Sequence, residues 1–190
     1  MTAAHCLCNV IREDGMCLLF KGVEYFPMYP FSGKSYKATH IVVPEDYINA
    51  KILGRISIPF DYGFIIFDCN DNLPGQSLEL DFNSKQEGVG ISIGYPDKWQ
   101  YGGTRMMKTE GVYENPSNIL ENYYVMQSND MPSGSSGGPI IDKNSGKVVS
   151  LNSNNYEEFY KEQMSGPVFN TSVKEAIDKL QVEIFQSFSV

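Results

Sequence analysis

The chain has 190 residues, a length that suits one domain or two small ones. Hydrophobic residues make up 42% of the sequence and charged residues 20%, so there is enough apolar material for a core and too little charge for disorder. Its 15 lysines and arginines against 23 acidic residues give a formal net charge of −8, which argues against nucleic-acid binding because phosphate-binding surfaces need clustered cations.

No membrane or targeting segment is predicted. The apolar run at residues 62–67 is far shorter than the roughly 20 residues that a membrane-spanning helix needs. The chain begins MTAAH, without the basic and then apolar stretches of a secretory signal. These features leave the cellular compartment undecided.

The cysteines do not form a recognisable metal-binding pattern. Three of them crowd the N-terminus, and the last 190 − 69 = 121 residues contain none, so no disulfide can link parts of the C-terminal half. Zinc sites usually need a C-x₂₋₄-C pair and a second ligand pair, which this sequence lacks, so we expect no metal. The disulfide state of four residues stays open: Cys6, Cys8, Cys17 and Cys69.

Short apolar runs broken by turn residues indicate an all-β chain. Runs rich in Val, Ile, Tyr and Phe alternate with Gly, Pro, Asn and Asp. We predict strands, in chain order, at residues 17–21, 37–43, 64–67, 90–94, 104–113, 123–127, 139–142, 147–152 and 167–170. Many short strands of this kind are typical of a sandwich or a barrel.

Two connections and one helix complete the predicted elements. Residues 70–88 are polar and turn-rich, as in a linker between two β units. Residues 143–146 predict a hairpin turn in which Gly146 can adopt a positive φ. A terminal helix is predicted from apolar residues at helical spacing and a capping residue before them: Val173, Ile177 and Leu180, with Thr171 or Ser172 as the cap.

A glycine-rich segment around two serines could form an oxyanion-binding loop. The sequence GSSGGP spans residues 134–139 and offers Ser136 as a nucleophile. Glycines permit tight turns and let consecutive backbone N–H groups point at one oxygen, as an oxyanion hole requires. A flexible Ser/Gly loop is the alternative interpretation.

A histidine and an aspartate elsewhere in the chain could serve such a serine. His5 lies in the segment TAAHC, where a packed core residue is the alternative interpretation. Asp61 precedes an apolar strand, and a carboxylate there is costly to bury without a partner. It is either a turn aspartate or the group that holds a histidine in one tautomer and stabilises its cation.

The order of the histidine, the aspartate and the serine along the chain distinguishes between the classes of Ser-His-Asp site. His5, Asp61 and Ser136 follow one another with gaps of 61 − 5 = 56 and 136 − 61 = 75 residues. This is the chain order of chymotrypsin-like enzymes and differs from the orders in subtilisins and α/β-hydrolases. Together, the motifs TAAHC, DYGFII and GSSGGP resemble the active-site motifs of the chymotrypsin/trypsin-like serine protease superfamily, and the resemblance covers nearly the whole chain.

Three further segments resemble the glutamyl-endopeptidase branch of that superfamily. IGYP at residues 93–96 is similar to the branch's GYP segment, and residues 148–152 fall where the branch has the strand beside its specificity pocket. Residues 166–169, followed by a terminal helix, resemble its closing strand and helix.

The resemblance implies an all-β fold of two packed antiparallel β-barrels, in which the first barrel is incomplete and a short helix ends the chain. Residues 1–70 are then the partial N-terminal barrel, residues 71–86 the linker, and residues 87–190 the C-terminal barrel with its helix.

The function that the resemblance implies is that of a serine endopeptidase, which hydrolyses peptide bonds through a Ser-His-Asp triad and an acyl-enzyme intermediate. Its partner is a peptide or protein substrate, and it needs no cofactor. Ser136 is the expected nucleophile, His5 the base and Asp61 the group that orients His5. The N–H groups of Gly134 and Ser136 are the expected oxyanion hole. The residues expected to bind substrate are Met131, Ser150, Leu151, Asn152 and Pro167.

Substrate preference is expected to differ from that of the glutamyl-specific enzymes. Met131 and Asn152 stand where those enzymes carry a threonine and a histidine, so we expect a small or apolar P1 side chain. Residues 150–152 are expected to offer an edge strand to an extended peptide. Ser135 replaces the aspartate that pairs with a newly cut N-terminus in trypsins, so activation by that ion pair is not expected.

The N-terminus departs most from the family pattern. About two strands precede the histidine in the family, whereas four residues precede His5. We therefore expect a truncated N-terminus, and a secreted protein if an upstream signal is missing from this sequence. A non-catalytic binding module or an inactive fragment of the same fold is the alternative function, and an esterase-like or viral-type relative that shares the triad is a third. The oligomeric state is not predicted.

Overall fold

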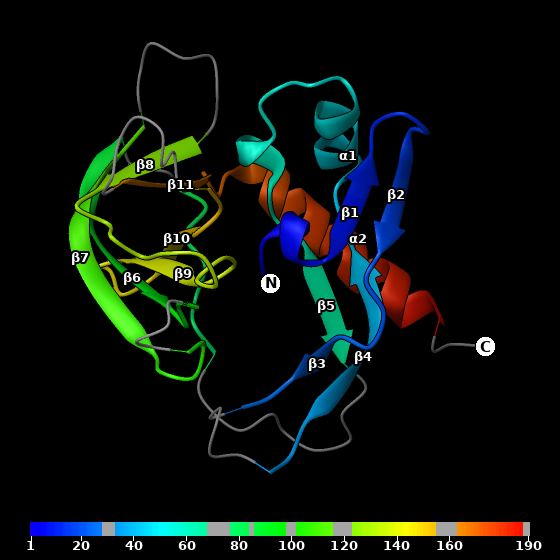
Figure 1. Ribbon diagram of the computed structural model, residues 1–190, viewed down its shortest axis with the longest axis horizontal. Coiled ribbons are helices and arrows are strands. Elements are labelled where there is room, and N and C mark those ends of the chain that lie inside the picture. Colours follow the sequence, from blue (N-terminus) through cyan, green and yellow to red (C-terminus); the bar gives the residue numbers. More distant parts are fainter. Residues whose placement is uncertain are drawn as a thin grey trace.

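The computed structural model describes residues 1–27, 33–67, 77–83, 86–97, 102–115, 123–154 and 163–187. Within these ranges the chain is mostly β, as the sequence predicts, and it has two α-helices, of which the sequence predicts only the terminal one (Figure 1). Neither of these helices combines the length and the apolar character needed to cross a membrane. Cys69 and two parts of the expected linker, residues 71–76 and 84–85, lie outside the described residues.

The N-terminal half carries two small antiparallel sheets. The first is a hairpin of β1 (Cys8–Ile11) and β2 (Met16–Leu19). The second has the order β3-β4-β5 and consists of β3 (Glu24–Tyr25), β4 (Tyr36–Val42) and β5 (Phe64–Phe67). The sequence predicts β2, β4 and β5 but misses β1 and β3. The missed strands are short, and β3 is defined by its pairing with β4 rather than by a local apolar pattern.

A helix between β4 and β5 is also missing from the prediction. α1 (Glu45–Ile52) follows Pro44, has two acidic residues in its first turn, and buries Tyr47 and Ala50. Gly54 follows it with a φ of 66°. Proline before a helix, acids in the first turn and glycine after the end are all helix-boundary signals. The helix is only 8 residues long, so its apolar periodicity is weak evidence by itself.

The C-terminal half forms one antiparallel sheet of six strands in the order β10-β9-β6-β7-β8-β11. In chain order the strands are β6 (Glu87–Gly94), β7 (Met107–Glu114), β8 (Tyr123–Gln127), β9 (Pro139–Asp142), β10 (Val148–Leu151) and β11 (Gln163–Pro167). Between β9 and β10, Gly146 has a φ of 70° and donates its N–H to Asp142 O at 2.8 Å, which confirms the predicted turn.

The two edge strands of this sheet meet and nearly close it into a barrel. Just beyond β10, Ser153 N donates to Ser165 O of β11 at 2.9 Å, and Ser165 N donates to Asn154 O at 2.8 Å. The prediction of the last strand at residues 167–170 is wrong, because the strand ends at Pro167 and the chain then turns into the terminal helix.

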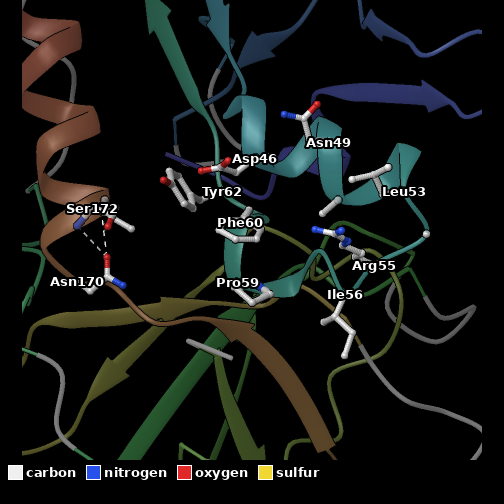
Figure 2. Close-up of a pocket in the computed structure, with 13 residues that line it drawn as sticks. Asp46, Asn49, Leu53, Arg55, Ile56, Pro59, Phe60, Tyr62, Asn170 and Ser172 are labelled. Carbon is white, nitrogen blue, oxygen red and sulfur yellow. Dashed lines mark hydrogen bonds between the residues drawn. The ribbon is translucent and has the colours of Figure 1, made fainter. Parts of the chain in front are cut away.

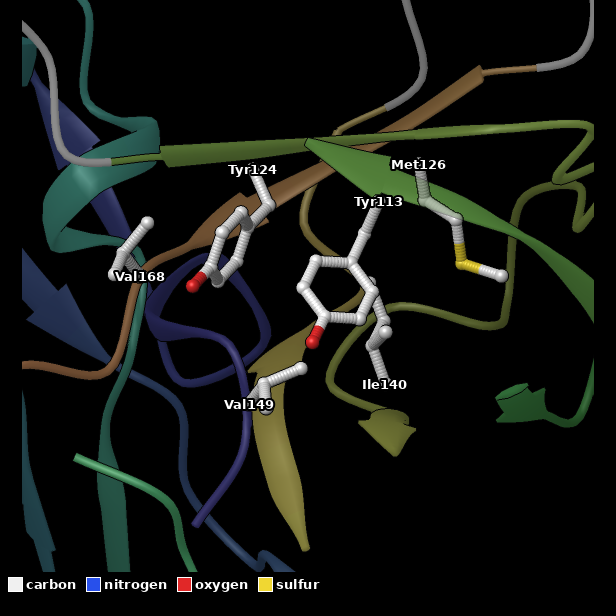
Figure 3. Packing of buried hydrophobic residues seen from close by; sticks show 6 residues of the cluster. All are labelled: Tyr113, Tyr124, Met126, Ile140, Val149 and Val168. Atoms are coloured by element: carbon white, nitrogen blue, oxygen red, sulfur yellow. The ribbon is translucent and has the colours of Figure 1, made fainter. Parts of the chain in front are cut away.

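A buried apolar cluster that includes two tyrosines lies inside the barrel (Figure 3). The rings of Tyr113 and Tyr124 pack edge to face with centroids 4.9 Å apart. Tyr113 is fully buried, and its hydroxyl donates to Asp142 Oδ2 at 2.7 Å, so its polar end is satisfied. The cluster consists of Tyr113, Tyr124, Met126, Ile140, Val149 and Val168.

A second apolar cluster joins the two halves of the chain. Tyr62, next to Asp61, packs with Leu151 of β10 and with Val173 of the terminal helix, α2 (Thr171–Ser187). The predicted helix is confirmed, but its cap is Asn170, whose Oδ1 accepts from the N–H groups of the second and third residues after it. This packing holds Asp61 against the barrel.

Candidate active site

His5 is positioned by the short segment before it. Thr2 N donates to Gly63 O at 3.0 Å, and Gly63 N donates to Thr2 O at 2.8 Å. A Cβ on residue 63 would lie 3.0 Å from the backbone carbonyl oxygen of Val42, so this close approach favours glycine. The pairing ties the residues that precede His5 to the chain that follows Asp61.

Asp61 contacts His5 through both carboxylate oxygens. The backbone N–H of His5 donates to Oδ1 at 2.9 Å, and Nδ1 of its ring lies 2.7 Å from Oδ2. The Asp61 side chain is 6% exposed, whereas the His5 side chain is 35% exposed. When Nδ1 carries its proton toward the carboxylate, Nε2 is left to accept a proton from a reacting group.

The two groups shift each other's protonation toward the charged pair. Burial lowers the pKa of His5, but hydrogen bonds and charges from Asp61 and Cys6 outweigh it and raise the pKa from 6.5 to about 10. Burial raises the pKa of Asp61, but the hydrogen bond and charge of His5 and the hydrogen bond from Ser153 lower it more. The site therefore stabilises an imidazolium beside a carboxylate.

Ser153 is a partner of Asp61 that the sequence analysis misses. It is 7% exposed, and its hydroxyl donates to Asp61 Oδ2, the same oxygen that faces the His5 ring. The two residues lie 92 positions apart, and the barrel closure beyond β10 brings them together. A serine at the end of a strand carries no local signal of this contact.

Ser136 lies in a loop whose backbone requires glycine on both sides. Gly134 has a φ of 91° and Gly137 a φ of 79°, both in the left-handed region. A Cβ on residue 137 would lie 3.0 Å from Ala3 N, so the loop packs against the segment that leads to His5. Among the described residues, no hydrogen bond joins Ser136 to His5.

The two expected oxyanion donors have no competing partner in the described part of the chain. Neither Gly134 N nor Ser136 N donates a backbone hydrogen bond there. The neighbouring Ser135 is 2% exposed, and its hydroxyl donates to Pro132 O at 2.6 Å, so the two serines of the motif have different environments. The free N–H groups suit an oxyanion hole.

The Asn152 side chain anchors this loop from inside the barrel. Its Oδ1 accepts from Ser92 Oγ at 2.7 Å, and its Nδ2 lies 3.2 Å from Ile93 O and 3.3 Å from Ser135 O. The residue is fully buried. All three hydrogen bonds are made with other residues of this chain, so the Asn152 side chain has its partners within the protein.

The backbone of Asn152 also forms hydrogen bonds with the Ser136 loop. Gly137 N donates to Asn152 O at 2.7 Å, and Asn152 N donates to Gly138 O at 2.8 Å. These bonds, together with those of the side chain, fix the loop on both sides of Ser136 to one buried residue.

The expected substrate-binding residues are all buried. Ser150, Leu151 and Asn152 are 0%, 3% and 0% exposed, and the Ser150 hydroxyl donates to Pro167 O at 2.8 Å. The expectation of an open edge at residues 150–152 is therefore corrected. The Ser150 hydroxyl bonds to β11, and the Asn152 backbone bonds to the Ser136 loop. Met131 is 2% exposed, and Pro167 is also buried.

Hollows of different size lie around the site. One of them, of about 670 Å³, lies between α1, the short helix η2 (Ile58–Phe60) and the start of α2 (Figure 2). Phe60 and Tyr62 line it, but Asp61 between them does not. Two smaller hollows of about 360 and 260 Å³ are lined by His5. In the described part of the chain, no cluster of His, Cys, Asp and Glu side chains could hold a metal ion.

Comparison with solved structures identifies the fold. The thermostable serine protease AL20 from an extremophilic microorganism matches with a TM-score of 0.75 and 22% identity, over 92% of this chain and 80% of that one. Protease Anisep from Arthrobacter nicotinovorans matches with a TM-score of 0.69 and 24% identity, over 92% and 78%. The fold is chymotrypsin-like.

A Glu endopeptidase solved in complex with MPD shares the chymotrypsin-like fold, with a TM-score of 0.71 and 21% identity over 95% of this chain and 80% of that one. The fold class predicted from the sequence is thereby confirmed. No family model matches the chain, and no curated protein matches its sequence.

Proposed function

We propose that the chain is a serine endopeptidase that uses Ser136, His5 and Asp61. The observation that carries this proposal is the double contact of His5 with a buried carboxylate 56 residues away, beside the glycine-rich loop of Ser136. The chymotrypsin-like fold supports it, because the three similar structures described above are proteases of this fold.

In the first half of the reaction, Ser136 Oγ attacks the carbonyl carbon of the scissile bond while His5 Nε2 takes the hydroxyl proton. Asp61 stabilises the imidazolium, which then gives the proton to the leaving amine, and an ester to Ser136 remains. In the second half, water attacks this ester with His5 as the base, releases the acid and restores the serine.

The tetrahedral intermediates are stabilised by the free N–H groups of Gly134 and Ser136. Donors of this kind contribute about 3–4 kcal/mol each to the transition state. Ser153 acts as a positioning residue, since its hydroxyl shares Asp61 Oδ2 with the His5 ring.

The substrate backbone pairs beyond the end of β10 rather than along it. The carbonyl of Ser153 accepts no backbone hydrogen bond from the described residues, so it can accept one from the N–H of an extended peptide. The preference for a small or apolar P1 side chain, based on Met131, is part of this proposal.

A non-catalytic binding module of the same fold is the second candidate, and the missing hydrogen bond between Ser136 and His5 favours it. Such bonds are often long in sites without substrate, whereas the double contact of His5 with Asp61 favours the endopeptidase.

A fluorophosphonate probe tests the proposal, because it reacts only with an activated serine. We expect one adduct, located at Ser136 by mass spectrometry, and none in Ser136→Ala or His5→Ala. Ser135→Ala is the matched control, since that buried, hydrogen-bonded serine is expected to leave labelling intact. A folded wild-type protein without an adduct would favour the binding module.

A further inference from the structure

Two hollows beside His5, the proposed base, are both lined by Lys51. One is lined by His5, Lys51, Ser57, Ile58 and Asn154, among others, and the second is lined by His5, Lys51 and Arg12. Lys51 lies in the last turn of α1, and its ammonium group lies 5.7 Å from the centre of the Tyr47 ring. Contact with that buried ring restricts where the charge can point.

The charges that line these hollows are unbalanced. The cations are Lys51 and Arg12, whereas the carboxylate is that of Asp61, which is buried and already engaged by His5. Among the described residues, neither cation forms an ion pair. Glu13 and Asp14 follow Arg12 in its turn but line neither hollow.

This positive spot contrasts with the chain as a whole, whose formal net charge is −8. It therefore does not follow from a generally basic surface. A cation beside a hollow of about 260 Å³ has room for a carboxylate side chain, which would gain the charge partner that the protein does not supply.

We propose that Lys51, with Arg12, selects substrates that carry an acidic side chain close to the scissile bond. The inference rests on the proposed function, which places the scissile bond at His5. Neither Met131 nor the Ser136 loop lines these hollows, so the acidic residue is a neighbour of the P1 residue and not P1 itself.

The test uses the full chain and a peptide whose cleavage requires Ser136, selected from a peptide mixture. With P1 constant, a single Glu is moved through positions P4 to P2 and P1′ to P3′, and each peptide is compared with its Gln twin in kcat/KM. We expect Glu to be preferred about three- to tenfold at one or more of these positions, as for a partly exposed ion pair.

Variants of Lys51 test whether this residue causes the preference for Glu over Gln. Lys51→Met is expected to bring the Glu/Gln ratio close to one, and Lys51→Glu to reverse it. Lys143→Met is the matched control, because Lys143 lines neither hollow and pairs with Glu110. Added salt is expected to weaken the wild-type preference.

A Glu/Gln ratio near one at every position in the wild type would overturn the inference while leaving peptidase activity established. A preference that survives Lys51→Met would overturn the role of this lysine. Absence of both probe labelling and Ser136-dependent cleavage would instead refute the proposed function, and the inference with it.

Discussion

Replacement of Asn152 by alanine is expected to lower the free energy of unfolding by about 2–5 kcal/mol. The side chain is fully buried and makes hydrogen bonds of 2.7, 3.2 and 3.3 Å with Ser92, Ile93 and Ser135. Each such bond contributes about 0.5–1.5 kcal/mol net, and buried groups left without a partner add to the loss. This is a large fraction of the roughly 5–15 kcal/mol that stabilises a typical domain.

The expected loss is measured by urea unfolding followed by far-UV circular dichroism. Asn154→Ala is the matched control, because Asn154 is exposed and its side chain makes no described hydrogen bond. Its free energy of unfolding is expected to stay within about 0.5 kcal/mol of the wild type. Equal stability of the two variants would refute the reasoning that buried bonds of Asn152 support the fold.

The same substitution tests the link between Asn152 and the Ser136 loop. Loss of the donor to Ser135 O frees the residue directly before the proposed nucleophile. Folded Asn152→Ala is therefore expected to react more slowly with the fluorophosphonate probe, in buffer without urea. An unchanged labelling rate would restrict the role of Asn152 to stability.

Further outcomes are expected from the same geometry. Asp61→Asn should lower kcat by about four orders of magnitude, because the amide no longer holds His5 in the required tautomer; a loss below tenfold would contradict this role. Because His5 must be neutral to act as a base and its pKa is raised to about 10, kcat/KM of the wild type should rise with pH across the alkaline range. Loss of the Asp61 carboxylate should lower the pKa of His5 and so move the rise in kcat/KM to lower pH. A rise that stayed at the same pH would exclude His5 as the group that titrates. Gly137→Ala should abolish probe labelling, since its Cβ would lie 3.0 Å from Ala3 N at a φ of 79°. Gly146→Ala, at a φ of 70° in open space, should cost stability only, and equal labelling of the two alanine variants would argue against the packing of the Ser136 loop.

Much of the candidate site could be predicted from local patterns. GSSGGP identifies a backbone that needs glycine, and the structure gives positive φ values to Gly134 and Gly137. The order of His5 and Asp61 predicts a pair, and the structure places their side chains 2.7 Å apart. The roles of these residues in a reaction stay a proposal.

Other parts could not be predicted, because they depend on distant strands. The open edge expected at residues 150–152 is buried, since the Ser136 loop and β11 both bond there. The contact of Ser153 with Asp61 arises from barrel closure across 92 residues. Among the elements that the sequence does not predict, β3 has only two residues, which are too few to show an alternating apolar pattern.

The sequence by itself determined the all-β class, the terminal helix and the types and order of the reactive residues. These follow from residue chemistry and short-range periodicity, which act along a few neighbouring positions. The tertiary structure alone decided which polar groups are buried, which backbone donors stay free and where Lys51 lies relative to His5. Burial and charge proximity depend on segments far apart in the chain, and only the packed barrel brings those segments together.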